Sequence, residues 1–295
     1  MKNLMPVFLA LLIVAGACQT SKKEATEETV TEAPEAAGPF LTQKWETDTL
    51  LNTCESVLFD AGKNVLYVAN IVGAPDGKDG NGFISKVSTD GAITELQWAT
   101  GLDAPKGMGL HGNSLFVTDL DKIVEIDTET GKVVKSYPVT GAQFLNDITV
   151  DNDGRVYASD SNVGFIVQLM GNEVSMWLDS VDGPNGLLAD GGNLLMAGWD
   201  SGTLNVIDPA TKAVTPKAEG IEHPDGIVAV GDGSYLVSTW DGMVHHVDAD
   251  GKTTKLLDTR ESGVNAADIE YIQDKNLLLV PTFFGNTVVA YELTR

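Results

Sequence analysis

The sequence is poor in basic residues, in cysteine and in long apolar runs, and each shortage excludes a class of protein. Its 19 lysines and arginines stand against 42 aspartates and glutamates, which gives the 295-residue chain a formal net charge of −23. That charge repels the phosphate backbone and argues against nucleic acid as a partner. A hydrophobic fraction of 43% is too high for a disordered acidic chain. We therefore expect a folded protein with a substantial core.

The longest apolar run lies at the N-terminus, where residues 4–17 follow Lys2 and end in small residues just before Cys18. About 14 apolar residues are too few to span a bilayer, which takes roughly 20, so we predict a signal peptide over residues 1–17. Small residues directly before a cysteine resemble a bacterial lipobox, which implies that Cys18 is lipidated. The protein would then lie at the bacterial cell envelope, on the periplasmic face or the cell surface, with this anchor as its only membrane contact. An ordinary signal peptide followed by an incidental cysteine is the alternative.

Residues 18–40 are rich in Glu, Thr, Ala and Lys and contain almost no large apolar side chain. Such a composition cannot bury enough surface to fold, so we predict a flexible tether that begins at the lipidated cysteine. The second cysteine, Cys54, then has no partner for an intramolecular disulfide. Stability must come from packing alone.

A repeat of about forty residues fills the chain from residue 54 to the end. Each unit has a polar residue, a short apolar strand, a turn with Gly, Asp or Asn, and two further strands rich in β-branched residues. The polar residues Lys106, Asn146, Asn185 and Asp225 stand 40, 39 and 40 positions apart. Six short-stranded units of this length are typical of a six-bladed β-propeller. We predict this all-β fold for residues 41–295, as one domain and as a monomer.

The sixth unit ends at Arg295, directly after its third strand. Its fourth strand must come from elsewhere, because an open sheet edge would otherwise remain. Residues 41–50 precede the first unit and can supply that strand. The sequence therefore predicts a ring that is closed by an N-terminal strand completing the last blade.

The polar residue that begins each unit is expected at one mouth of the central channel. These residues are Glu55, Lys106, Asn146, Asn185, Asp225 and Asp268. The carboxylate and amide oxygens among them suit a divalent cation, Ca²⁺ best, with Mg²⁺ and Mn²⁺ as alternatives. None of these six residues is His or Cys, which argues against zinc. Asn and Asp before Gly are also ordinary turn formers, which is the structural alternative.

A second set of residues is expected to contact a small-molecule substrate on the same face. Trp199 and Trp240 hold equivalent places in adjacent units, and Phe283 follows in the last unit. Such rings can stack on a flat or sugar-like ligand, although packing between blades explains them equally well. Lys106 and Asp268 complete this predicted substrate-binding set, unless they pair with each other across the channel.

Four of these positions carry a resemblance to a known family. Pro184-Asn185-Gly186 and Pro224-Asp225-Gly226 stand in consecutive units, with Asn146-Asp147 one unit earlier and Glu55 in the first. Over residues 41–295 this pattern resembles the senescence marker protein/gluconolactonase/luciferin-regenerating enzyme family, whose regucalcin-like members are six-bladed propellers. The resemblance implies that Glu55, Asn146, Asn185 and Asp225 bind a divalent metal. Phe144 replaces a family arginine that contacts sugar lactones, so the resemblance does not extend to an aldonolactone substrate.

Two functions follow as hypotheses. The first is a metal-dependent hydrolase, gluconolactonase-like, that acts on a small lactone or ester. A metal would polarise the carbonyl group, and Asp225 would act as the catalytic base or hold the metal that activates water. The alternative is a non-catalytic propeller, braced by calcium, that binds a ligand or protein partner at the cell envelope.

Substitution of Cys18 by serine tests the predicted lipid anchor. A serine at this position cannot form the thioether, so incorporation of a labelled fatty acid should be lost. The measurement is metabolic acyl labelling of the wild type and the variant in a bacterial host. Unchanged labelling in Cys18→Ser would overturn the assignment.

Overall fold

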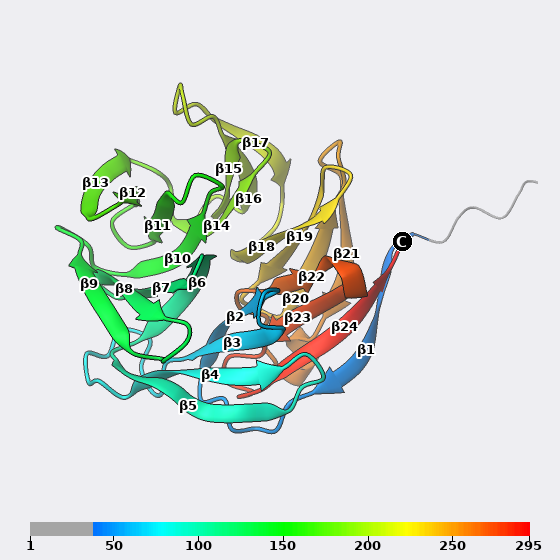
Figure 1. Ribbon diagram of the computed structural model, residues 1–295. Coiled ribbons are helices and arrows are strands. Elements are labelled where there is room, and N and C mark those ends of the chain that lie inside the picture. Colours follow the sequence, from blue (N-terminus) through cyan, green and yellow to red (C-terminus); the bar gives the residue numbers. More distant parts are fainter. Residues whose placement is uncertain (1–37) are drawn as a thin grey trace, which may run out of the picture. The chain divides into compact units, whose positions relative to one another are not determined.

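Short runs of β-branched and apolar residues, separated by Gly and Asp turns, form 24 strands in this protein. The computed structural model describes residues 38–295. The strands make six four-stranded antiparallel sheets around a central channel, so the predicted six-bladed β-propeller is confirmed (Figure 1). The predicted signal peptide, Cys18 and most of the predicted tether lie outside the described residues. No helix in residues 38–295 is long and apolar enough to cross a membrane.

The first three blades follow the chain from the inner strand to the outer one. Blade 1 contains β2 (Cys54–Asp60), β3 (Val65–Asn70), β4 (Gly82–Ser88) and β5 (Ile93–Leu102). Blade 2 contains β6 (Pro105–His111), β7 (Ser114–Asp119), β8 (Lys122–Asp127) and β9 (Val133–Pro138). Blade 3 contains β10 (Leu145–Val150), β11 (Val156–Asp160), β12 (Phe165–Met170) and β13 (Glu173–Leu178).

The last three blades keep this order, except that the outer strand of blade 6 comes from the start of the domain. Blade 4 contains β14 (Pro184–Asp190), β15 (Asn193–Gly198), β16 (Thr203–Ile207) and β17 (Val214–Glu219). Blade 5 contains β18 (Pro224–Gly231), β19 (Ser234–Thr239), β20 (Met243–Val247) and β21 (Thr253–Asp258). Blade 6 contains β22 (Glu270–Ile272), β23 (Leu277–Pro281), β24 (Val288–Thr294) and β1 (Phe40–Glu46), with the short 3₁₀ turns η1 (Arg260–Ser262) and η2 (Gln273–Lys275) before and after β22.

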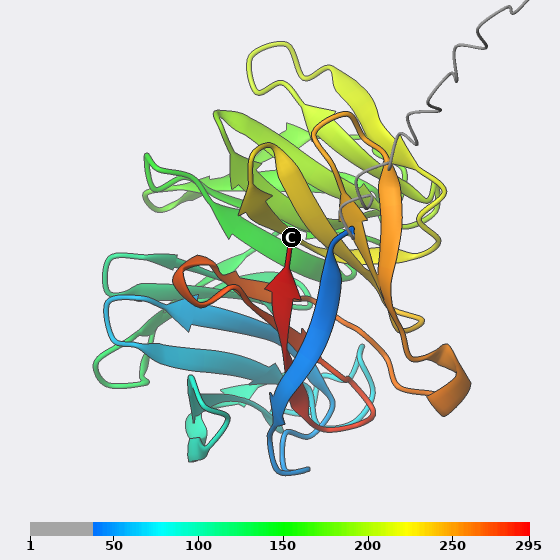
Figure 2. The same ribbon diagram turned by 90° about the vertical axis from the view of Figure 1, so that its right-hand side faces the viewer.

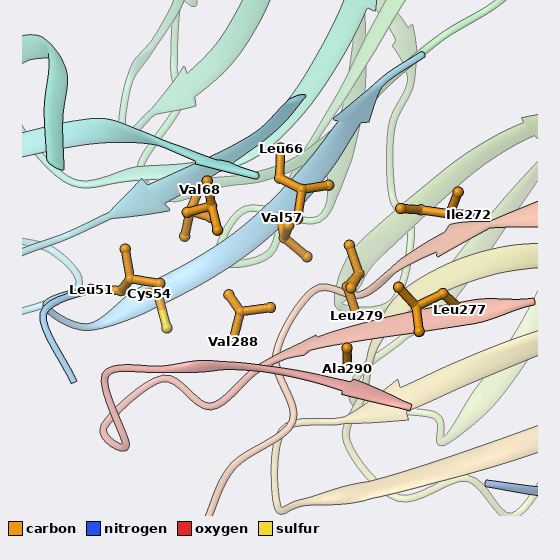
Figure 3. Close-up of a cluster of buried hydrophobic side chains, with 11 residues drawn as sticks. Leu51, Cys54, Val57, Leu66, Val68, Ile272, Leu277, Leu279, Val288 and Ala290 are labelled. Carbon is orange, nitrogen blue, oxygen red and sulfur yellow. The ribbon is translucent and has the colours of Figure 1, made fainter. Parts of the chain in front are cut away.

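The ring closes as the sequence predicts, through pairing of β1 with the last strand. β1 runs antiparallel to β24, with Phe40 opposite Thr294 and Trp45 opposite Ala290 (Figures 1 and 2). The strand begins at Phe40, one residue before the predicted domain boundary. Behind this closure, apolar side chains of blades 1 and 6, such as Val57 and Leu279, form one buried cluster (Figure 3).

Hydroxyl groups on the second strands hold neighbouring blades together near the channel. Ser159 donates to the carbonyl oxygen of Asn185 at 2.8 Å, and Ser238 donates to that of Ala267 at 2.7 Å. Thr118 donates to the carbonyl oxygen of Asn146 in the same way. Each bond fixes the first residues of the next inner strand relative to the blade before it.

This pattern changes the alignment of the sixth blade by one residue. Ala267, not Asp268, accepts the hydroxyl bond and is therefore the equivalent of Asn146 and Asn185. Asp268 is equivalent to Asp147, one step further along the inner strand. The sequence has no Pro-x-Gly tripeptide in this blade, so the register predicted from the repeat lies one residue too far along the chain.

Glycines allow the inner strands to approach each other closely at the channel. A Cβ atom at Gly186 would collide with the carbonyl oxygen of Asp225 in the next blade. Likewise, a Cβ at Gly107 or Gly226 would collide with a carboxyl oxygen of Asp147 or Asp268. These positions need glycine for space, since none of the three has a positive φ.

Replacement of Gly186 by alanine should therefore destabilise the propeller. Overpacking against a fixed backbone costs about 1–3 kcal/mol, and the loss should appear as a lower midpoint in urea unfolding. Gly38→Ala is the matched control, because its Cβ would meet nothing within 4 Å. Equal stability of the two variants would contradict the close approach.

Candidate functional site

One end of the channel opens into a cavity of about 670 Å³, which we call the mouth cavity. The loops between second and third strands form its wall, and the starts of β2, β6, β10, β14 and β18 form its floor. The lining residues are Glu55, Ile71, Pro75, Lys106, Phe144, Asn146, Ser161, Asn162, Asn185, Trp199, Asp200, Asp225, Trp240, Phe283 and Phe284. Thus all four predicted metal ligands and four of the five predicted substrate-binding residues meet in one place. Asp268 does not line the cavity.

The four predicted ligands contribute oxygen atoms from four different blades. The Asn185 amide donates to Asp225 Oδ1 at 3.0 Å and to the Pro224 carbonyl oxygen at 3.4 Å. This orients Asn185 Oδ1 away from both acceptors. Asn146 donates to Ser161 Oγ at 3.2 Å, which leaves its own amide oxygen available. Asn185 Oδ1 and Glu55 Oε2 are buried and have no hydrogen-bond partner.

The carboxyl groups of Glu55 and Asp225 are held in an environment that disfavours their charge. Burial, followed by the charge of Asp225, raises the pKa of Glu55 well above its usual range, against the opposing effect of Lys106. Burial likewise raises the pKa of Asp225 to about 7, and the charge of Asp147 adds to this shift. Both shifts have the cause expected for carboxyl groups that are buried close to one another.

These features fit a divalent cation of the hard, oxygen-binding type. Buried polar oxygens without partners are costly, and a cation would satisfy Glu55 Oε2 and Asn185 Oδ1 together while neutralising the two carboxylates. Residues 38–295 contain no cluster of three or more His, Cys, Asp or Glu arranged for a metal. Any such site therefore depends on amide oxygens as well as carboxylates, a donor set that suits Ca²⁺ better than zinc.

Lys106 stands at the start of its inner strand, as these ligands do, but its longer side chain reaches the wall of the cavity. Its ammonium donates to the carbonyl oxygens of Pro75 at 2.9 Å and Ala104 at 3.2 Å. It also lies 4.2 Å from the centre of the Phe144 ring. Burial lowers the pKa of Lys106 to about 8, although the charge of Glu55 acts in the opposite direction. The ion pair with Asp268, the alternative for these two positions, is not formed in residues 38–295.

Aromatic side chains make up much of the wall. Phe283 and Phe284 meet edge to face with ring centres 4.7 Å apart, and Trp240 packs edge-on against both. Phe283 is buried and also belongs to an apolar cluster with Ile71 and Leu120, so it contributes to packing as well as to the wall. Trp199 instead stacks on His223 at 4.9 Å. His223 lies outside the mouth cavity, exposed and bonded to Asp241 at 2.7 Å.

Below the cavity, a pair of carboxyl groups spans the channel. Asp147 of blade 3 and Asp268 of blade 6 come within hydrogen-bonding reach of each other. Burial raises the pKa of Asp147 to about 7 and that of Asp268 well above its usual range. The sequence contains a signal for this pair, since Asp147 stands where three other blades have glycine.

Cys54 takes no part in the site. It is fully buried, its thiol donates to the Thr287 carbonyl oxygen at 3.1 Å, and burial raises its pKa to about 12. A thiol in that state is not a nucleophile near neutral pH.

Sequence comparison finds one partial match. Residues 110–218 match a family described as outer membrane protein assembly factor BamB. This covers less than half of the chain. No curated protein matches the sequence.

Solved structures show the same fold at low sequence identity. A gluconolactonase from Xanthomonas campestris is 18% identical with a TM-score of 0.65, over 82% of this chain and 86% of that one. Virginiamycin B lyase from Staphylococcus aureus is 13% identical with a TM-score of 0.65, over 88% of this chain and 100% of that one. A chain of the nidogen/laminin complex is 21% identical with a TM-score of 0.59, over 72% of this chain and 82% of that one. This protein therefore has the propeller fold of gluconolactonases, of a lyase and of a chain from a protein–protein complex.

Calcium binding to the mouth cavity should stabilise the protein. A cation that binds only the folded state adds about 2.7 kcal/mol at a hundredfold excess over its Kd, so the melting temperature should rise with calcium and fall again with a chelator. Glu55→Gln removes one of the two carboxylates and should abolish most of this shift.

The same variant separates lost binding from lost folding. Without calcium, Glu55→Gln should melt no lower than the wild type, because it removes a buried charge that lacks a partner. Glu173→Gln is the matched control, since Glu173 is exposed on β13. An equal calcium shift in all three proteins would rule out Glu55 as a ligand.

Proposed function

We propose that this protein is a metal-dependent hydrolase of the lactonase or esterase type, which acts on a small lactone or ester in the mouth cavity. The observation that carries the proposal is the pair of buried, unpartnered oxygens, Glu55 Oε2 and Asn185 Oδ1, at the floor of an open cavity. The gluconolactonase with the same fold supports it.

Glu55, Asn146, Asn185 and Asp225 would hold the cation, Ca²⁺ in the first place, with Mg²⁺ and Mn²⁺ as alternatives. The cation would supply Lewis acidity for the carbonyl oxygen and lower the pKa of a nearby water. The chain itself orients these oxygens through the bond from Asn185 to Asp225 and through the close approach at Gly186.

Asp225 has a second role in this proposal. Of the two predicted carboxylate ligands in the described residues, only Asp225 accepts a hydrogen bond from another predicted ligand, Asn185. This bond holds its carboxylate in place. From there it can accept a proton from the attacking water, unless its charge is fully engaged by the cation, which lowers its basicity. We favour water activated by the cation, with Asp225 as the ligand that positions it.

The wall of the cavity would bind the rest of the substrate. Trp199, Trp240 and Phe283 present ring faces or edges for a flat or sugar-like group, and Lys106 offers a positive charge. Asp268 does not line the cavity, so any effect it has on the substrate would pass through its neighbour Asp147. Through Cys18, the enzyme would be held at the bacterial cell envelope as a lipid-anchored monomer.

A second candidate function rests on the burial of the proposed ligands. Glu55, Asn185 and Asp225 are only 6%, 2% and 4% exposed. A cation held that tightly can brace four blades without any chemistry. The protein would then bind a ligand or a protein partner over the aromatic wall, as a non-catalytic propeller.

Substitution of Asp225 by alanine distinguishes the two functions. If the protein is a hydrolase, Asp225→Ala should lower kcat/KM for a lactone or ester at least ~100-fold, and chelation should do the same to the wild type. The measurement is initial-rate hydrolysis across a panel of lactones and aryl esters, with and without calcium.

Asp250→Ala is the matched control, because Asp250 is an exposed turn residue remote from the lining. Undiminished hydrolysis by Asp225→Ala would refute its assigned role. Ligand-induced shifts in melting temperature without any turnover would instead favour the binding propeller.

A further inference from the structure

We propose that the mouth cavity recognises a carboxylate on its substrate, and that Lys106 is the residue that binds this group. The inference rests on the hydrolase function proposed above and narrows its substrate to an ester or lactone that carries a carboxylate beside an apolar body.

The first observation is a buried ammonium without a counter-ion. Lys106 is only 1% exposed. Its two hydrogen-bond acceptors are the neutral carbonyl oxygens of Pro75 and Ala104, and it forms no ion pair within residues 38–295. Burying an ammonium in this way is costly unless an anion compensates it. An anionic group bound in the cavity would supply the missing charge.

The second observation is that the ammonium is held in place with one donor to spare. An ammonium has three N–H groups, and the two carbonyl oxygens use two of them. The Phe144 ring, 4.2 Å away, supports the cation from another side. The geometry is therefore fixed before a ligand arrives, which lowers the entropy lost on binding.

The third observation concerns the surroundings of Lys106 in the cavity. Among the described residues that line it, Lys106 is the only lysine or arginine. Four carboxylates raise the pKa of Lys106 through their charge, those of Glu55, Asp119, Asp76 and Asp160, but none of them accepts a hydrogen bond from its ammonium. The acidic residues Glu55 and Asp225 belong to the floor and Asp200 to the wall, and the Phe144 ring lies beside the ammonium.

These three features define the ligand chemistry. The carboxylate would meet Lys106 at the wall, the apolar or aromatic body would contact the ring faces, and the reacting carbonyl group would lie over the oxygens of the floor. Charge-assisted hydrogen bonds of this kind are about twice as strong as neutral ones.

Equilibrium binding of two matched probes tests the inference without any turnover. The probes are 3-phenylpropanoate and its neutral amide, 3-phenylpropanamide, titrated into the calcium-free protein and followed by NMR. The carboxylate should bind at least ~10-fold more tightly than the amide. Lys106→Met should abolish this preference, while Lys106→Arg should keep it. Lys132→Met, in an exposed turn, changes the net charge equally and should leave the preference intact.

Three outcomes would overturn the inference. These are equal affinity for both probes in the wild type, no saturable binding of the carboxylate at millimolar concentration, and an unchanged preference in a folded Lys106→Met. If Lys106→Met does not fold, the affinities of the wild type and of Lys106→Arg for the two probes still test the inference. Hydrolysis is measured separately on neutral and carboxylated phenyl esters. Tighter binding of the carboxylate probe without any hydrolysis would reject only the proposed hydrolase function. Metal-dependent hydrolysis without tighter binding of the carboxylate would reject only the role of Lys106.

Discussion

Two buried carboxyl groups at one end of the channel, those of Glu55 and Asp225, are the constraint on which the rest of the site depends. Burial raises the pKa of both, and the oxygen atoms Glu55 Oε2 and Asn185 Oδ1 have no hydrogen-bond partner. A fold does not retain such groups for stability, because apolar residues of similar size would cost less. A divalent cation would relieve the charge and satisfy both orphaned oxygens, which is why we propose a metal at the floor of the cavity.

The propeller brings these groups together by simple means. The hydroxyl groups of Thr118, Ser159 and Ser238 fix three of the inner strands against the previous blade, and glycines such as Gly186 let neighbouring backbones approach. Short side chains at the start of each inner strand then converge on the axis. Lys106 occupies the same position with a longer side chain, so its charge reaches the wall instead. One structural position thus provides both the proposed metal floor and a separate cationic group.

Much of this architecture can be predicted from the sequence repeat. The spacing of Asn146, Asn185 and Asp225 predicts the blades and the shared mouth, because equivalent residues of a propeller occupy equivalent places around the axis. The truncated last unit predicts closure by β1. The alignment of Asp268 differs from the structure by one residue, because its blade lacks the Pro-x-Gly tripeptide that fixes the register of blades 2, 4 and 5. The direction of the Lys106 side chain could not be predicted, because it depends on contacts with Pro75 and Phe144 from distant parts of the chain.

The measurement that tests the central claim most directly is a crystal structure of the protein grown with calcium, and with manganese to give an anomalous signal. The account predicts one anomalous peak in the mouth cavity, coordinated by Glu55, Asn146, Asn185 and Asp225. With calcium, the metal–oxygen distances should be about 2.3–2.6 Å. A cavity without a peak at millimolar metal, or a metal bound only elsewhere on the acidic surface, would contradict the account.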